Sequence, residues 1–120
     1  MSNYDENNIF AKILRGEIPC DKVYEDEYVL AFRDIAPQAP VHILVIPKGA
    51  YISLNDFGAQ GSAEEVKAFF SAVSKIAEEN DIAEGGFRSI ANTGQNGGQE
   101  VPHFHLHLLG GKPIGSMVSA

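Results

Sequence analysis

Little in this sequence suits an oxidising or a membrane environment. The chain has a single cysteine, Cys20, so no disulfide can form within it. No apolar stretch near the start resembles a signal peptide, and no run approaches the roughly 20 apolar residues of a membrane-spanning helix. These features predict a protein of the reducing cytoplasm that does not enter a membrane.

Basic residues are also scarce. Nine lysines and arginines stand against 16 aspartates and glutamates, which gives a formal net charge of −7 with neutral histidines. Nucleic acids and anionic lipid surfaces are bound through clustered positive charge. The chain is therefore expected to bind neither. This argument does not extend to a single nucleotide, whose phosphate can be held by backbone N–H groups and imidazoles.

Length and composition predict one globular domain. The chain has 120 residues and a mass of 13.0 kDa, with 44% hydrophobic and 21% charged residues, as in an ordinary compact domain. We expect a single domain over residues 1–120. Its polar first residues, 1–6, are expected to be flexible, and residues 112–120 are expected to form a C-terminal tail.

Hydrophobic periodicity predicts an α+β fold. Asn7 or Asn8 can cap a short helix, and Ser62-Ala63-Glu64-Glu65 has the capping pattern that begins a long one. The continuous apolar run 42–46 predicts a central strand buried on both faces. The elements in chain order are a helix at 9–14, a hairpin from 21 to 32, the strand at 42–46, the long helix from 63, and strands at 87–91 and 101–109. Hairpins in place of regular strand–helix alternation indicate a five-stranded antiparallel sheet with one short and one long helix.

Three of the four histidines lie at every second position of the last predicted strand. Because side chains alternate between the faces of a strand, His103, His105 and His107 are expected on one face. The positions between them are apolar and would face the core. This alternation specifies the register, since a slip of one residue would bury the imidazoles and expose the apolar side chains.

Residue spacing alone leaves three explanations for this row of histidines. The rings could be solvated side chains on the wet face of a sheet. They could also ligate zinc as neutral imidazoles, with His42 or Glu100 as a further ligand. The third explanation is covalent catalysis, in which one neutral imidazole attacks phosphorus while its other ring nitrogen is held protonated. Neighbouring rings would then donate to the phosphate oxygens or to the leaving group.

A segment rich in glycine and asparagine, residues 92–99, precedes this strand. Glycines let backbone N–H groups approach a phosphate closely, although such segments are more often only turns. The strand sequence His103-Phe104-His105-Leu106-His107-Leu108-Leu109 resembles the His-φ-His-φ-His-φ-φ signature of the histidine triad family. Similarity to its Hint branch, the histidine triad nucleotide-binding proteins, extends over nearly the whole chain, through residues 7–19, 31–35, 37–40 with His42, 45–47, and 97–111.

The resemblance implies the fold and activity of that branch. Hint proteins are purine nucleoside phosphoramidases, which cleave the P–N bond between AMP or GMP and an amine through a nucleotidyl-histidine intermediate, and acyl-adenylates are further substrates by analogy. The resemblance implies that His105 is the nucleophile and that His107 contacts the phosphate near the leaving group. It also implies that His103 and His42 belong to a supporting polar network. Asp34 is implied to bind both ribose hydroxyls, and no cofactor or metal is implied. The other implied nucleotide-binding residues are Ile9, Phe10, Ile13, Phe32 and Ile35 around the base, and Asn92, Gly98, Gln99, Glu100 and Val101 around the phosphate.

The chain departs from the animal Hint proteins at two places. Glu100 stands where they have serine near the leaving group, and residues 114–120 lack the tryptophan of the animal tail. Both differences bear on substrate preference.

Because the family forms two-fold dimers whose sheets join, a homodimer is also implied. Two other functions remain open, namely a dinucleoside polyphosphate hydrolase of the Fhit branch and a non-catalytic zinc- or nucleotide-binding regulatory protein.

Overall fold

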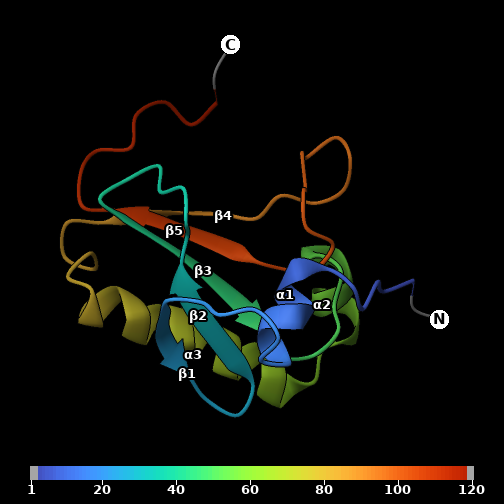
Figure 1. The fold of residues 1–120 in the computed structure, drawn as a ribbon. Coiled ribbons are helices and arrows are strands. Elements are labelled where there is room, and N and C mark those ends of the chain that lie inside the picture. The colour runs from blue at the N-terminus through green and yellow to red at the C-terminus, as the bar shows by residue number, and fades with distance from the viewer. Residues whose placement is uncertain (1–2, 119–120) are drawn as a thin grey trace.

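The protein folds into a five-stranded antiparallel sheet with helices packed against it (Figure 1). The computed structural model describes residues 3–118, so the predicted domain ends at 1–2 and 119–120 lie outside the described residues. The strand order is β1-β2-β3-β5-β4. The predicted α+β antiparallel architecture is confirmed. The elements are α1 (Ile9–Leu14), β1 (Lys22–Glu25), β2 (Val29–Arg33), β3 (Val41–Pro47), α2 (Leu54–Gln60), α3 (Ala63–Glu79), β4 (Phe87–Ile90) and β5 (Leu106–Gly110).

Strand β3 lies at the centre of the sheet because it is apolar on both faces. Ile43 and Val45 point into the larger hydrophobic core, while Leu44 and Ile46 belong to a smaller core on the opposite face. β2 pairs with one edge of β3 and β5 with the other. The prediction of a central strand from its continuous hydrophobic run is therefore confirmed.

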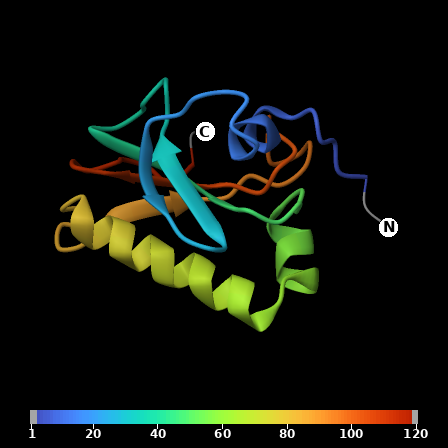
Figure 2. The same cartoon turned by 60° about the horizontal axis from the view of Figure 1, so that its bottom comes forward.

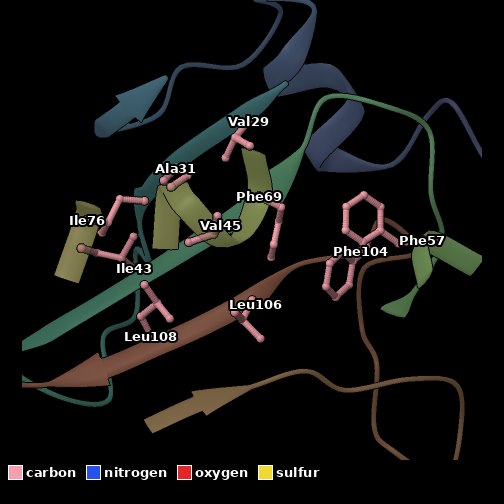
Figure 3. Packing of buried hydrophobic residues seen from close by; sticks show 11 residues of the cluster. Val29, Ala31, Ile43, Val45, Phe57, Phe69, Ile76, Phe104, Leu106 and Leu108 are labelled. Atoms are coloured by element: carbon pink, nitrogen blue, oxygen red, sulfur yellow. The ribbon is translucent and has the colours of Figure 1, made fainter. Parts of the chain in front are cut away.

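The two faces of the sheet are covered by different helices (Figure 2). Helix α3 lies along one face, where Phe69 and Ile76 pack against strand residues such as Leu108 (Figure 3). Helix α1 lies on the other face, where Phe10 meets Phe32 edge to face with 5.5 Å between ring centroids. Residues 42–47 of β3 are thus buried on both faces of the sheet.

Helix α2 is missing from the sequence-based prediction, which had one short and one long helix. It has a complete capping box, in which Ser53 and Asp56 satisfy each other's backbone N–H groups. Its seven residues bury only Phe57, so they carry no readable helical period. Phe57 is nevertheless important, because it stacks on Phe104 at 5.2 Å and holds the segment before β5.

Strand β5 begins five residues later than the predicted start at residue 101. Its pairing with β3 starts at Val45 and Leu106, and the next pairs would involve Pro47, which has no N–H to donate. His103 and His105 therefore precede the regular strand, and only His107 lies within it. Side-chain alternation continues through this irregular segment, since the apolar residues between the histidines all enter the larger core.

None of the helices within residues 3–118 is both long enough and apolar enough to cross a membrane. The longest, α3, has its polar face in solvent and carries charged residues along it.

We expect removal of the α3 cap to destabilise the fold. Ser62 accepts a hydrogen bond from the Glu65 N–H at 3.0 Å, and the Glu65 carboxylate accepts one from the Ser62 N–H at 2.9 Å. Ser62→Ala should lower the free energy of unfolding by about 1 kcal/mol, measured by urea denaturation. The matched control is Ser74→Ala on the exposed face of the same helix, which should raise it by a few tenths of a kcal/mol, at about the propensity difference. Equal effects of the two substitutions would contradict this account of the cap.

Candidate active site

A cavity of 660 Å³ opens on the α1 side of the sheet, where α1, β2, β3, β5 and the loop 91–101 meet. With the exception of Gln99, every residue predicted to bind nucleotide lines it: Ile9, Phe10, Ile13, Phe32, Asp34, Ile35, Asn92, Gly98, Glu100, Val101, His105 and His107. His42 and His103 lie behind this lining. The chain thus brings its predicted site residues together from segments that are far apart in the sequence.

One end of the cavity is apolar. Phe10 and Phe32 are both buried there, and Ile13 packs against the same cluster. Ile35 is different, because it lies at the rim and is 99% exposed. In this structure it can cover a ligand's outer edge but does not form a wall of the cavity.

Several lining residues were not predicted. They are Ile18, Pro19, Cys20, Asp21, Arg33 and Leu44. Residues 18–21 enter the lining because the chain passes the cavity on its way from α1 to β1, and nothing in their pattern signals this. The place of Leu44 in the lining could have been predicted, since it lies two residues after His42 and so on the same face of β3, and it pairs with His107 of β5. Burial raises the pKa of the Cys20 thiol.

The ring of His105 is held in one tautomer. Its Nδ1–H donates to the backbone carbonyl of His103 over 2.7 Å, so the lone pair of the neutral ring is on Nε2. Phe10 packs edge to face on the ring at 5.0 Å. Burial lowers the pKa of His105, which keeps the imidazole neutral at physiological pH. A neutral imidazole with a fixed Nδ1–H is a competent nucleophile at Nε2.

His107 and His42 form a second hydrogen-bonded pair. The backbone N–H of Gln38 donates to Nδ1 of His42 over 3.0 Å, so the proton of this neutral ring is on Nε2. That Nε2–H donates to Nδ1 of His107, also over 3.0 Å, which puts the proton of His107 on its own Nε2. Burial, reinforced by the neighbouring rings of His105 and His42, lowers the pKa of His107 to about 4. His107 is therefore a neutral hydrogen-bond donor beside His105, with 5.1 Å between their ring centroids.

His103 lies outside the cavity and is fully buried. Its Nε2–H donates to the backbone carbonyl of Pro47 over 2.8 Å, and its Nδ1 accepts a hydrogen bond from the hydroxyl of Tyr4. Burial lowers the pKa of His103 to about 4. The alternative of solvated histidines on a wet sheet face does not hold for this residue or for His105, because both are covered by the N-terminal segment and α1.

The loop that precedes the histidines is held by Gln99. Its side-chain oxygen accepts from the Gly94 N–H at 3.0 Å, and its amide donates to the carbonyls of Ile52 at 2.6 Å and Val101 at 3.0 Å. These bonds occupy the side chain that the sequence assigned to nucleotide binding. Gly97 is required for the turn, since a Cβ there would lie 2.5 Å from the Thr93 carbonyl oxygen.

A metal ion would fit this site poorly. Asp34, His42 and His107 bring one donor atom each within 4.8 Å of the others, and His42 Nε2 lies 3.5 Å from an Asp34 carboxylate oxygen. However, the Gln38 N–H requires a lone pair on Nδ1 of His42, so the atom that faces the other two donors carries the proton. A zinc ligand needs a lone pair at that atom. The zinc explanation of the histidines is disfavoured by this bond.

The sheet, the cavity and the row of neutral histidines together define a histidine triad protein. Residues 15–114 match the HIT domain, and the chain belongs to this family. It is 51% identical over 114 residues, 95% of each chain, to a protein of Escherichia coli (strain K12) named purine nucleoside phosphoramidase. It is also similar to two solved structures. One is a histidine triad protein from Clostridium difficile, at 45% identity and a TM-score of 0.84 over 98% of this chain and 100% of that one. The other is a HIT family hydrolase from Clostridium thermocellum, at 42% identity and a TM-score of 0.87 over 96% and 99%.

The buried histidines predict that stability falls as the pH falls from neutrality. In the folded protein the pKa of His103 and that of His107 are about 4, against 6.5 ordinarily. Unfolding therefore takes up protons between these values, so the stabilisation is complete above about pH 6.5 and is lost as pH falls toward 4. Urea denaturation at pH 5 should give a free energy of unfolding lower by about 3–4 kcal/mol than at pH 7, from the two histidines together.

The carboxylate of Glu25 contributes to stability in a lower pH range than the histidines. Its pKa is lowered to about 2 by Lys22 and Lys48, so its contribution to the free energy of unfolding is lost only below about pH 4.5.

The histidines responsible for the loss between pH 6.5 and pH 4 can be identified directly from their ring signals in an NMR titration. Titration of His103 or His107 above pH 6 would contradict the assignment.

Proposed function

We propose that this nucleotide hydrolase of the HIT family is a purine nucleoside phosphoramidase that works through a covalent nucleotidyl-histidine. It hydrolyses the P–N bond of AMP or GMP joined to an amine and releases the nucleoside monophosphate. The observation that supports this most is the 2.7 Å bond from Nδ1–H of His105 to the His103 carbonyl, which leaves the Nε2 lone pair for attack. The E. coli relative named for this activity supports the same substrate class.

The reaction follows from the tautomers of the rings. Nε2 of His105 attacks the α-phosphorus, and the P–N bond breaks as the amine leaves with the bonding electrons and takes a proton from water. The Nε2–H of His107 donates to a phosphate oxygen and stabilises the charge that develops there. A water molecule then attacks phosphorus and gives a proton to the hydroxide left by the first step, the P–Nε2 bond breaks, and the monophosphate is released.

The intermediate carries a positive charge on the His105 ring, because Nδ1–H and Nε2–P are both present. The His103 carbonyl, which accepts from Nδ1–H, stabilises that charge. The carboxylates of Asp34 and Glu100 act in the same direction, since both oppose the lowering of the His105 pKa by burial. The environment therefore suits a neutral nucleophile before attack and a cationic ring after it.

The remaining parts of the cavity suit a purine nucleoside. Its apolar end can enclose a purine ring by contact alone and so accept adenine or guanine. Asp34 is assigned to the ribose hydroxyls, with one carboxylate oxygen held by the Ala36 N–H at 2.8 Å. Asn92, Gly98 and Glu100 are assigned to the phosphate and leaving-group end. Acyl-adenylates carry the same α-phosphate and nucleoside and are proposed as further substrates. No cofactor is needed for these steps.

A homodimer and a cytoplasmic location complete the proposal. β4 is an edge strand, so a second copy could extend the sheet there. Phe87 on that strand is 38% exposed, and Phe70 on α3 is 56% exposed, which favours burial of both in an interface. Sedimentation equilibrium should give twice the chain mass of 13.0 kDa, and Phe70→Glu should shift the protein toward monomer. A wild-type mass of one chain would contradict the dimer.

The covalent step is tested by trapping. Rapid quenching of the enzyme with an adenosine phosphoramidate, followed by mass spectrometry of the peptide that contains residues 103–107, should find AMP on His105. His105→Ala should lower turnover by at least about 1,000-fold, because the nucleophile is removed, while AMP binding changes less than about fivefold. Turnover with no adduct on His105 would refute the covalent mechanism.

A substrate panel separates the phosphoramidase from a dinucleoside polyphosphate hydrolase. Both would use His105, so the adduct alone does not distinguish them. We expect adenosine phosphoramidates to be hydrolysed with the higher kcat/KM. The reverse preference would assign the chain to the second activity, and AMP binding without turnover of either class would favour a regulatory role.

A further inference from the structure

We propose that Tyr4 is a positioning residue for the reaction: its hydroxyl fixes the ring of His103, whose backbone carbonyl in turn sets the tautomer of the nucleophile His105. The inference rests on the proposed function. Tyr4 lies ahead of α1 and outside residues 15–114, the part of the chain that matches the HIT domain. It falls within residues 1–6, for which the sequence predicts only a flexible N-terminus.

The contact between Tyr4 and His103 joins a segment near the start of the chain to the segment just before its last strand. The hydroxyl is hydrogen-bonded to Nδ1 of His103, and the two rings meet edge to face with 5.6 Å between centroids. The direction of the bond follows from the other ring nitrogen. Because Nε2 of His103 faces the Pro47 carbonyl, which can only accept, Nε2 carries the proton and Nδ1 accepts from Tyr4. Burial raises the pKa of Tyr4, which keeps the hydroxyl protonated as a donor.

His103 thus has a bond at each ring nitrogen and a third at its own carbonyl. Nδ1 is held by Tyr4, Nε2 by Pro47, and the carbonyl oxygen accepts from Nδ1–H of His105. Loss of the Tyr4 hydroxyl would leave a buried ring nitrogen without this donor. The ring could then change its tautomer or rotate, and the backbone that carries the acceptor for His105 would move with it.

Such anchoring is needed because this segment lies outside the sheet ladder. β5 begins at Leu106, so neither His103 nor His105 has its backbone held by strand pairing. The backbone N–H of His103 donates to Val101, a local bond within the loop, and the next N–H donates to Tyr51. The buried ring of His103 therefore adds an anchor to those of Phe104, in a place where a regular strand would be held by its ladder.

The segment that carries Tyr4 is itself tied to α1. Asn8 caps the helix through the Ala11 N–H at 2.9 Å, and its side-chain amide donates to the Asp5 carbonyl at 2.7 Å. The same helix places Phe10 on the ring of His105. One continuous segment, residues 4–14, thus touches both buried histidines of the row.

The test compares Tyr4→Phe with Tyr24→Phe. The first keeps the ring packing on His103 and removes only the hydroxyl. The second is the matched control. It removes the hydroxyl of Tyr24 on β1, which donates to Asp26 over 2.8 Å and lies away from the histidines. With an adenosine phosphoramidate, Tyr4→Phe should lower kcat about 5- to 20-fold and leave KM within about twofold, as expected for loss of the hydrogen bond to His103 that acts on the nucleophile. Tyr24→Phe should leave both constants within about twofold of wild type.

Nitrogen-15 NMR of the histidine rings supplies the second measurement. In wild type, His105 should be the Nδ1–H tautomer and His103 the Nε2–H tautomer. In Tyr4→Phe, His105 should become a mixture of tautomers, whereas Tyr24→Phe should keep the wild-type pattern. An unchanged kcat, or a lower kcat with an unchanged His105 tautomer, would overturn the proposal. Because the spectra need no substrate, they test the Tyr4 linkage even if the wild type proves inactive on phosphoramidates, which would count against the proposed function alone.

Discussion

The site depends on one hydrogen bond, from Nδ1–H of His105 to the carbonyl of His103. An imidazole in water exchanges its proton between two nitrogens, and only one of the two forms presents a lone pair to the cavity. The bond selects that form, and burial beneath α1 lowers the pKa so that the ring stays uncharged. Geometry and desolvation therefore act on the same atom. The other features of the fold exclude water from residues 103–105 and hold the carbonyl of His103 in place.

The two-sided burial of β3 provides that protection. A sheet with one wet face would leave alternate side chains of β5 in solvent, and their rings would titrate near the ordinary histidine value. Here α3 covers one face and α1 with the N-terminal segment covers part of the other. The histidine row thus lies in a second, smaller interior, where its side chains bond to backbone carbonyls, to a tyrosine hydroxyl and to the ring of His42.

Much of the scaffold could be predicted because strong local signals coincide with burial. The apolar run of β3 predicts a central strand, and the capping box of α3 predicts the start of a helix. The alternation around His105 predicts which side chains share a face. Helix α2 was missed, since it is short and buries only Phe57. The late start of β5 was missed because it arises from Pro47 on a neighbouring strand. The role of Gln99 within its loop, and the contact of Tyr4 with His103, depend on partners 47 and 99 positions away, which local patterns cannot reveal.

That separation of 99 positions has a consequence for how the protein is made. Contacts between distant parts of a chain form late, because closing the intervening loop costs entropy that only the assembled core offsets. As the chain emerges from the ribosome, the β1–β2 hairpin and α3 are available long before residues 103–107. The histidine row is completed only when the last strand docks between β3 and β4 and meets the first residues of the chain. An unfinished or truncated chain would hold the binding walls of the cavity without the reactive ring.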